Sequence, residues 1–333
     1  MKILVTGGGG FLGRHIVALL VKRDYTVSTF SRAPKPELRE LGVTHMEGDL
    51  SDAAAVGRAC AGMDAVFHTA ARAGVWGSWL DFFEPNVLGT RHVLAACRQV
   101  GVPILVYTST PSVVFNGEPF TGADESLPYG RNWLCHYAHT KSIAEREVLA
   151  ANDGAAFRSI ALRPHLIWGV GDPHIIPRVI AKARSGRLRI IGDGRNRVDI
   201  THVRDAAAAH LCALDALTKG NPGGKPYFIS QGEPVVLWDW INQLLQSVGV
   251  PPIGKRISLR AAYRVGAVLE GIYKLFRISA EPPMTRFVAV ELAKDHFFNT
   301  AAARKDLGYE PRTTSEEGIK ELATDLTGTS AQA

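Results

Sequence analysis

The sequence is poor in cysteine and has no long apolar run. Its four cysteines, Cys60, Cys97, Cys135 and Cys212, form no C-x-x-C pair. This pattern argues against a disulfide framework or a zinc site, so we expect a reduced compartment and no metal. No apolar stretch approaches the ~20 residues that a membrane-spanning helix needs. The opening MKILVTGG is typical of a first strand rather than of a signal peptide, and we therefore expect a cytoplasmic protein.

Charge of either sign is spread thinly along the chain. Its 333 residues carry 38 Lys and Arg against 32 Asp and Glu, a net charge of +6. The positive charges form no run of five or more, which argues against a nucleic-acid partner. The hydrophobic content of 46% and the length are those of a globular protein with a sizeable core and about two domains.

A glycine-rich stretch follows the first strand. Residues 3–5 are apolar, and a helical pattern continues to residue 21. Glycines spaced three apart between a strand and a helix allow a tight turn and a close approach of the backbone to a pyrophosphate, whose charge then lies at the helix N-terminus. The residues that would meet such a dinucleotide are Gly7, Gly10, Phe11, Leu12 and Gly13.

Strand and helix patterns then alternate. Strands are predicted at 25–31, 43–47, 64–70 and 104–108, with helices between them, the clearest at 86–99. This alternation predicts an α/β fold with a doubly wound, parallel Rossmann sheet. We expect residues 1–165 to form the dinucleotide-binding domain. Residues 166–333 would form a smaller, mostly helical substrate-binding part interleaved with it, with helices at 177–185 and 203–217 and strands at 187–191 and 226–230.

The end of the second strand bears on the choice of cofactor. An acidic residue there binds the 2′-hydroxyl of NAD, whereas a basic one accommodates the 2′-phosphate of NADP. Here the strand ends in Ser31 and Arg32, without an acid at its tip. The guanidinium of Arg32 offers a fork to a phosphate, so we favour NADP(H) and keep NAD(H) as the alternative. Arg32 could instead stack on the adenine or point to solvent.

Tyr137 and Lys141 lie four residues apart, so on a helix they share one face. Alone, this spacing is equally typical of a half-buried tyrosine beside a solvated lysine. With the other motifs it resembles the extended short-chain dehydrogenase/reductase superfamily, in order and spacing from residue 3 to the region of residue 170. The matching pieces are the glycine loop 7–13, Gly48-Asp49-Leu50, His68-Thr69-Ala70-Ala71, Asn86 in NVLGTRHVL, YTSTPS at 107–112, Tyr137-x-x-x-Lys141 and Arg163-Pro164 in LRPHLIWG.

The resemblance implies roles for these residues. Asp49, followed by Leu50, would hydrogen-bond the adenine amine. Ala70 and Ala71 would let the backbone pass close to the cofactor, which Pro164 would also contact. Tyr137 would exchange a proton with the substrate oxygen, and Lys141 would lower the pKa of its phenol and hold the nicotinamide ribose. Thr110 would orient the same oxygen, with Ser112 nearby. Asn86 would either support a proton path through water or cap a helix.

The substrate side is less constrained. Four aromatic residues fall in the stretch 75–83, which we expect to form a loop over the cleft, since ligands bind beyond the carboxyl ends of parallel strands. Trp76 and Trp79 would contact an apolar substrate there, or else pack locally. A basic group is expected for a substrate carboxylate. The candidates are Arg72, Arg131, His139, Arg163 and His165, and Arg163 could instead form a structural ion pair.

Residues 259–277 combine an apolar stripe with basic residues. The stripe is Leu259, Ala262, Tyr263, Gly266, Leu269, Tyr273 and Phe276, at helical spacing. We favour an ordinary amphipathic helix packed on the domain, with an apolar cavity nearby. The alternative is a lid over a long-chain substrate with weak affinity for a membrane surface.

Within the superfamily, the chain is most similar to the 3β-hydroxysteroid dehydrogenase-like branch. AARAGVWGSW, YTSTPSV, YAHTKSIAE and LRPHLIWGVGD resemble the bacterial 2-alkyl-3-oxoalkanoate reductases of olefin biosynthesis. The sterol-4α-carboxylate 3-dehydrogenases share LRPH and GKPYFISQGEP in general form. Both subgroups interconvert a 3-hydroxy and a 3-oxo group on a bulky apolar acid. A nucleotide-sugar epimerase and an NAD(P) sensor without turnover stay open as alternatives. The resemblance also implies a possible homodimer through a two-helix face.

Overall fold

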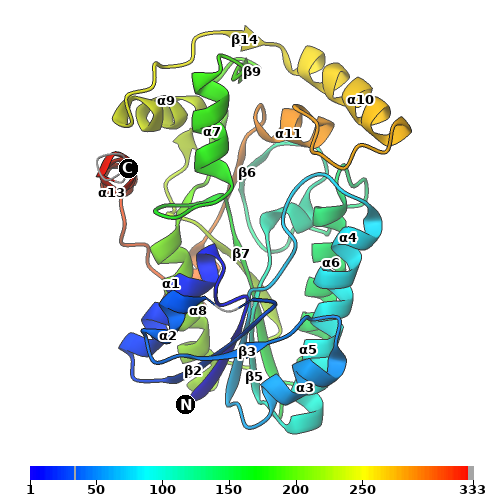
Figure 1. The fold of residues 1–333 in the computed structure, drawn as a ribbon, viewed down its shortest axis with the longest axis vertical. Coiled ribbons are helices and arrows are strands. Elements are labelled where there is room, and N and C mark those ends of the chain that lie inside the picture. The colour runs from blue at the N-terminus through cyan, green and yellow to red at the C-terminus, as the bar shows by residue number, and fades with distance from the viewer. Residues whose placement is uncertain (34, 329–333) are drawn as a thin grey trace.

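A seven-stranded parallel sheet lies at the centre of the molecule (Figure 1). The computed structural model describes residues 1–33 and 35–328. The strand order is β12-β7-β5-β4-β1-β2-β3, and each pairing is parallel. This confirms the predicted doubly wound sheet. The strands are β1 (Lys2–Thr6), β2 (Thr26–Ser31), β3 (Thr44–Glu47), β4 (Ala65–His68), β5 (Ile104–Thr108), β7 (Arg158–Pro164) and β12 (Lys225–Ile229).

Helices cover both faces of this sheet. Successive side chains of a strand point to opposite faces, so Ile3 and Val5 join the core under α1, α8 and α12, whereas Leu4 joins the core under α3, α5 and α6. Because both faces are covered, the central strands are buried and rich in apolar residues. The helices are α1 (Phe11–Lys22), α2 (Pro36–Arg39), α3 (Ala53–Cys60), α5 (Gly89–Val100), α6 (His136–Ala150), α8 (Val203–Thr218) and α12 (Ala301–Leu307).

The rest of the C-terminal half is mostly helical, as predicted, and has its own core around Trp168, Trp238 and Trp240. Its helices are α7 (Ile175–Arg184), α9 (Leu237–Ser247), α10 (Leu259–Leu275), α11 (Arg286–Glu291) and α13 (Ser315–Gly328). Three small sheets complete this part of the described chain. One has four strands, in the order β13 (Val235–Val236), β10 (Arg197–Val198), β15 (His296–Phe298) and β6 (Phe120–Ala123). The other two are pairs: β11 (Thr201–His202) with β8 (Ile167–Trp168), and β14 (Arg256–Ile257) with β9 (Ile190–Ile191).

The two halves share elements. Strand β12 and helix α8, from the second half, belong to the central layer, and strand β6, from the first half, pairs with β15. The domain division at residue 165 stays a prediction. Among the described residues, every helix is either too short or too polar to cross a membrane.

The main correction concerns residues 75–99. The sequence predicted a loop over 75–83 and a helix from Asn86, but helix α4 (Trp79–Phe83) and a π-helical turn, η1 (Glu84–Leu88), run directly into α5. Helix α4 begins where it does because of a capping box: the Ser78 hydroxyl accepts from the Asp81 N–H, and the Asp81 carboxylate accepts from the Ser78 N–H. That Ser-x-x-Asp pattern was readable in the sequence.

Candidate active site

The glycine loop between β1 and α1 leaves no room for side chains. Gly7 has φ of 69°, in the left-handed region, and a Cβ there would lie 2.9 Å from the backbone of Ala70. A Cβ on Gly13 would lie 2.2 Å from the carbonyl oxygen of Gly7. Gly10 is the N-cap of α1 and has no side chain to occupy the first N–H groups, so this helix end is open to an anion. The cradle fits the pyrophosphate of a dinucleotide.

Two basic side chains that the sequence did not single out border the loop. A Cβ on Gly9 would lie 2.5 Å from Cγ of Lys35, so the Lys35 side chain lies over the loop. Arg14, in the first turn of α1, donates to the carbonyl oxygen of Val170 at 3.3 Å. Both cations stand where phosphate charge would be placed. In the sequence, the only indication that these two residues belong to the site was their position near the glycines and near Arg32.

The predicted adenosine side lies at the ends of β2 and β3. Ser31 donates to the carbonyl oxygen of Ala33 at 3.0 Å, and Arg32 is exposed. Asp49 accepts from the Ser51 N–H at 2.9 Å. That hydrogen bond, with a smaller contribution from the nearby Arg32 cation, lowers the pKa of the Asp49 carboxyl. Leu50 is buried and packs against Gly89. The structure therefore brings Arg32 and Asp49 to the same edge of the sheet.

Asn86 ties the stretch after β4 to helix α6. Its Oδ1 accepts from the Arg72 N–H at 2.8 Å, and its Nδ2 donates to the Arg72 carbonyl and to Thr140 Oγ1, each at 3.1 Å. Thr140 stands between Tyr137 and Lys141 on α6. Asn86 lies inside the π-helical turn, so the alternative of a helix N-cap is wrong. Its side-chain amide therefore hydrogen-bonds the residue after Ala71 and a residue one turn after Tyr137, and so connects the two segments that carry these predicted site residues.

The sequence predicted His68 only as part of a motif, but in the structure its side chain hydrogen-bonds residues of two other elements beneath the site. The Thr90 hydroxyl donates to the Asn86 carbonyl at 2.6 Å, so it accepts from His68 Nε2–H at 3.0 Å. His68 Nδ1 then accepts from the Thr6 hydroxyl at 2.7 Å. Burial, and secondarily the Lys141 ammonium, lowers the pKa of His68 to about 3. A neutral, fixed imidazole therefore links β1, β4 and α5.

Thr110 and Tyr137 face each other. Thr110 follows β5 and caps a 3-10 turn, η2 (Pro111–Val114), by accepting from the Ser112 N–H at 3.2 Å. Burial raises the pKa of Tyr137 to about 12, and a hydrogen bond with Thr110 opposes that shift. The Ser109 hydroxyl is buried and has no partner among the described residues. The Thr110 hydroxyl donates to Ser112 Oγ at 3.2 Å, and it also lies close enough to Tyr137 to affect the pKa of the phenol.

Lys141 lies one turn after Tyr137 on α6 and is only 2% exposed. Its ammonium donates to the Thr108 carbonyl at 2.6 Å and lies 4.2 Å from the ring centre of Tyr107. Burial lowers the pKa of Lys141 to about 7, although the Glu145 carboxylate opposes the shift. The ammonium is thus aimed at the end of β5. Its predicted lowering of the Tyr137 pKa stays a prediction for the cofactor-bound state.

Arg163, a candidate for the substrate carboxylate, is engaged elsewhere. Its Nε and Nη2 donate to the Glu145 carboxylate at 2.6 to 3.2 Å, and the two side chains are 2% and 0% exposed. Glu145 also accepts from the Tyr129 hydroxyl at 2.8 Å. The geometry supports the structural ion pair between α6 and β7. Pro164, at the end of β7, follows directly.

His165 forms a buried pair with His296, whose Nδ1 lies 2.6 Å from His165 Nε2. His296 Nε2 donates to the Glu291 carbonyl at 2.6 Å, so His165 must be the donor within the pair. Side-chain atoms of His165, Glu291 and His296 come within 4.8 Å of one another. Both ring nitrogens of His296 are already hydrogen-bonded, which favours a structural chain over a metal centre.

The two tryptophans pack locally. Trp76 donates to the Ile278 carbonyl at 3.2 Å and meets the edge of Tyr273 at the end of α10. Trp79 stacks on Phe83 and contacts His136 and His139. These contacts support the local-packing alternative, although Trp79 packs directly on α6.

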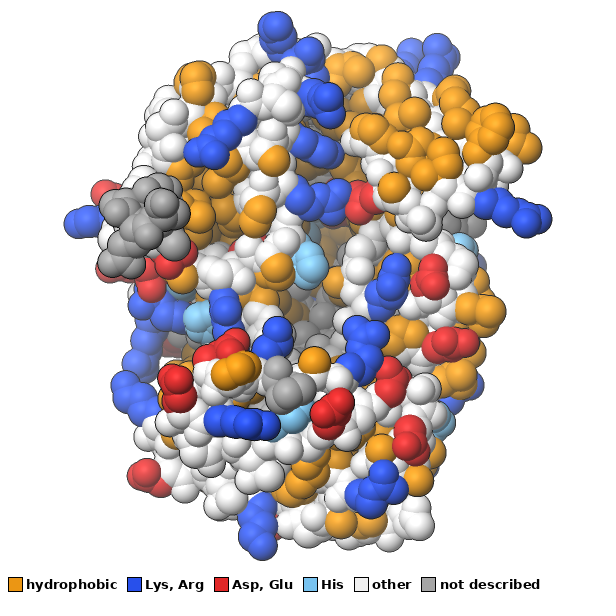
Figure 2. Space-filling view, viewed as in Figure 1, with side chains coloured by type: hydrophobic (Ala, Val, Ile, Leu, Met, Phe, Trp, Pro, Cys, Tyr) orange, Lys and Arg blue, Asp and Glu red, His pale blue; other side chains and the backbone are white. Residues whose placement is uncertain are grey.

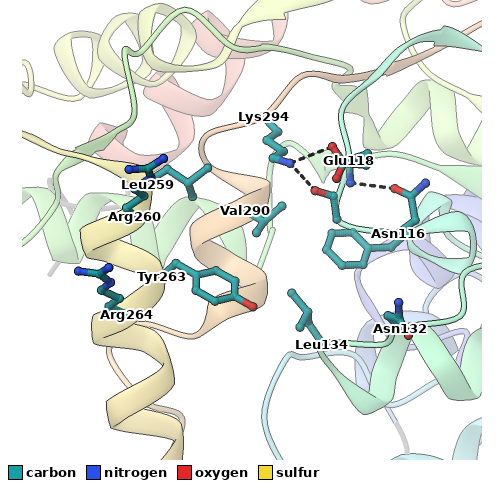
Figure 3. A pocket seen from close by; sticks show the side chains of 12 residues that line it. Asn116, Glu118, Asn132, Leu134, Leu259, Arg260, Tyr263, Arg264, Val290 and Lys294 are labelled. Carbon is teal, nitrogen blue, oxygen red and sulfur yellow. Dashed lines mark hydrogen bonds and ion pairs between the residues drawn. The ribbon is translucent and has the colours of Figure 1, made fainter.

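A pocket of about 540 Å³ lies between α10, α11 and the stretch 115–118, with an apolar part around Leu134, Tyr263 and Val290 and a polar rim that includes Glu118, Arg260, Arg264 and Lys294. Figure 3 shows Tyr263 of α10 and Val290 of α11 facing Leu134 across it. Leu134, Tyr263 and Val290 also pack in one apolar cluster with Tyr137 and Phe115. The reacting hydroxyls therefore lie next to an apolar recess.

The sequence profile of the 3-beta hydroxysteroid dehydrogenase/isomerase family matches residues 4–260. The chain belongs to this family. It is 50% identical over 326 residues to the 2-alkyl-3-oxoalkanoate reductase of Stenotrophomonas maltophilia (strain K279a), covering 97% of this chain and 98% of that protein. It is 32% identical to the sterol-4-alpha-carboxylate 3-dehydrogenase, decarboxylating, of Mus musculus, over 96% of this chain and 89% of that one.

A solved structure of similar fold is MoeE5 in complex with UDP-glucuronic acid and NAD, with a TM-score of 0.74 and 25% identity over 99% of this chain and 100% of that one. The predicted membership of the 3β-hydroxysteroid dehydrogenase-like branch is confirmed. The relatives of this family are named as reductases and dehydrogenases, so the prediction of an oxidoreductase is confirmed as well.

Proposed function

We propose that this enzyme reduces the 3-oxo group of a 2-alkyl-3-oxoalkanoate to the 3-hydroxy group, with NADP(H) as its cofactor. The observation that carries the proposal is the packing of Tyr137 against residues that line the pocket, with Lys141 one helical turn away and Thr110 close to the phenol. The named relative at 50% identity supports this substrate class. The glycine cradle and the NAD bound to MoeE5 support a dinucleotide.

Each residue of the site has a separate role in this proposal. A nicotinamide dinucleotide held by the glycine loop would supply or accept the hydride. With its pKa near 12, Tyr137 is a protonated phenol at neutral pH and can donate its proton to the substrate oxygen. Thr110 hydrogen-bonds the same oxygen and fixes its direction. Lys141, with a pKa of about 7, is poised to hold a ribose hydroxyl or restore the proton. Asn86 acts as a positioning residue, because its amide contacts Arg72 and Thr140.

The preference for NADP(H) rests on two cations. Arg32 stands exposed at the end of β2, and the Lys35 side chain passes over the glycine loop. The strand tip carries no acid that would repel a 2′-phosphate. Together these groups would bind the 2′-phosphate, while Asp49 and Leu50 meet the adenine and Ala70, Ala71 and Pro164 line the nicotinamide side.

Two other activities are alternatives to this proposed reduction. The 32%-identical mouse relative favours a sterol-4α-carboxylate 3-dehydrogenase using NAD, and the fold shared with MoeE5 keeps a nucleotide-sugar enzyme in third place. The apolar part of the pocket, around Leu134, Tyr263 and Val290, favours a lipid-like acid over a sugar nucleotide, and Arg260, Arg264 and Lys294 line the same pocket with positive charge. Arg72, Arg131 and His139 stay candidates for the carboxylate partner.

The test is an oxidation assay in the reverse direction. A racemic long-chain 2-alkyl-3-hydroxyalkanoic acid is mixed with the enzyme and either NADP⁺ or NAD⁺, and the reduced cofactor is followed by its absorbance. We expect turnover, faster with NADP⁺. Turnover of a 4-carboxysterol with NAD⁺ alone would replace the proposal by the sterol activity. Turnover of a nucleotide sugar alone would replace it by the epimerase activity.

We further propose that the enzyme works at the surface of an anionic lipid bilayer. Of the ten large hydrophobic side chains that are exposed among the described residues, six lie on or just after α10: Val265, Val268, Ile272, Leu275, Phe276 and Ile278. They form one helical face, which Figure 2 shows as a patch of hydrophobic side chains over α10. The stripe read from the sequence lies largely on the other, packed face of the helix. Phe276 is the exception, since it is 69% exposed.

Charge favours a lipid surface over other occupants of this face. Arg260, Arg264 and Lys274 flank the exposed face, whereas Glu270, the single acid of α10, is buried and paired with Arg286. An apolar face with basic flanks matches anionic headgroups. The same helix lines the pocket through Leu259 and Tyr263, so a lipid-like substrate would enter from the bilayer side. A homodimer stays a prediction.

A further inference from the structure

A second cavity, largely enclosed by protein (the closed cavity), lies past the end of α11 from the apolar cluster that contains Tyr137. It measures about 90 Å³ and is enclosed by α7, α9 and the end of α11. Trp168, Val179, Trp240 and Ile241 form most of its wall, and no polar atom is exposed in it. An apolar cavity of this kind stays dry and accepts apolar ligands. It is smaller than the ~150 Å³ cavity that takes one benzene ring, so it suits the end of an alkyl chain rather than a fused ring system.

The polar groups at its edge are satisfied internally. His296 borders the cavity, but its Nε2 donates to the Glu291 carbonyl and its Nδ1 accepts from His165 Nε2, each at 2.6 Å. Glu291 borders the cavity as well, with its carboxylate 3.9 Å from His296 Nε2, and burial raises the pKa of that carboxyl, but no polar atom of either side chain is exposed in the cavity.

Helix α11 connects this cavity with the reacting residues. Phe287, Val288 and Val290 pack in the apolar cluster that contains Tyr137. The next residues, Glu291 and Leu292, line the closed cavity. Val290 also lines the open pocket of about 540 Å³ on the other side of the helix. The end of α11 thus separates two apolar recesses, one closed and one open, next to the catalytic tyrosine.

We infer that the two recesses hold the two alkyl branches of one substrate apart. This inference rests on the proposed function. A 2-alkyl-3-oxoalkanoate carries one chain on C2 and another beyond C3, and two chains that diverge from neighbouring carbons need two recesses. The end of one branch enters the closed cavity, which limits its length. The other branch lies in the open pocket, which does not. The enzyme therefore limits the length of one alkyl branch and accepts different lengths of the other.

The test uses two series of 2-alkyl-3-oxoalkanoates and the full-length enzyme. In one series the C2 branch is lengthened stepwise, and in the other the chain beyond C3, with kcat/KM measured for each member. We expect a sharp length limit in one series only. Val179→Phe, which fills the cavity, should lower the long-to-short ratio of kcat/KM in that series about tenfold. Val179→Ala, which enlarges the cavity, should move the limit to longer chains.

Two controls separate this inference from its alternatives. Leu134→Phe, in the open pocket, should act on the other series, and Val100→Phe, at an exposed site far from both recesses, should change neither. The inference is overturned when Val179→Phe lowers both series by the same factor, or when neither Val179 variant moves the limit. If the wild-type enzyme turns over no 2-alkyl-3-oxo acid at all, the proposed function fails first and the two-branch assignment falls with it.

Discussion

Replacing Arg163 by methionine distinguishes a structural from a substrate-binding role. The Arg163 guanidinium and the Glu145 carboxylate share three hydrogen bonds of 2.6 to 3.2 Å, and both side chains are buried. Removing one partner of a buried ion pair leaves the other charge uncompensated, which costs about 3–5 kcal/mol. Glu145 would keep the hydroxyl of Tyr129 as a donor. We therefore expect Arg163→Met to lower the free energy of unfolding by about 3 kcal/mol.

The assay is urea unfolding followed by circular dichroism and fluorescence, with the double variant Glu145→Met/Arg163→Met as the matched control. An apolar pair of similar volume is often neutral relative to the ion pair, so the double variant should recover most of the lost stability. The reasoning is refuted if Arg163→Met changes the free energy of unfolding by less than about 0.5 kcal/mol and instead raises KM for the acid substrate. That result would make Arg163 a ligand of the carboxylate.

Three further predictions follow from single side chains. Because burial lowers the pKa of Lys141 to about 7, the unfolded chain binds more protons there between about pH 7 and 10. This group then adds about 1.4 kcal/mol of stability per pH unit as pH rises, and Lys141→Met should remove that slope from unfolding curves; equal slopes would contradict it. Arg32→Ala should lower the NADP⁺-to-NAD⁺ ratio of kcat/KM about 10- to 100-fold, whereas an unchanged ratio would mean that Arg32 points to solvent. Phe276→Glu should weaken sedimentation with anionic vesicles about tenfold relative to Val100→Glu. A concentration-dependent dimer that Phe276→Glu disrupts would assign the face to a second copy instead.

The parts of the fold that were predicted correctly depend mainly on short stretches of the sequence. The glycine spacing could be recognised from the sequence because Gly13 meets the backbone of Gly7, only six residues away, whereas the contact of Gly7 with Ala70 forms only in the assembled sheet. Strand β5 was predicted with its observed bounds, because an apolar run between turns depends on its own residues. Tyr137 and Lys141 were placed on one helix turn for the same reason.

Pairings across the chain could not be predicted. His165 meets His296 across 131 residues, and the Lys141 ammonium meets the Thr108 carbonyl across 33, contacts that only the assembled sheet creates. Nor does helical periodicity tell which apolar face of α10 is covered when both faces are apolar. The packed face is the one with small residues, because a Cβ on Gly266 would lie 2.7 Å from the backbone of Thr285.

The most direct measurement of the central claim compares wild type with Tyr137→Phe. NADPH binding is followed by fluorescence, and turnover of a long-chain 2-alkyl-3-oxoalkanoate by loss of NADPH. Because Tyr137 supplies the proton and the glycine loop supplies the phosphate site, the variant should bind NADPH with an unchanged Kd and lose turnover by about 10²–10⁴-fold. Retained turnover would show that another group is the acid. Tight NADPH binding with no turnover in the wild type as well would favour a sensor.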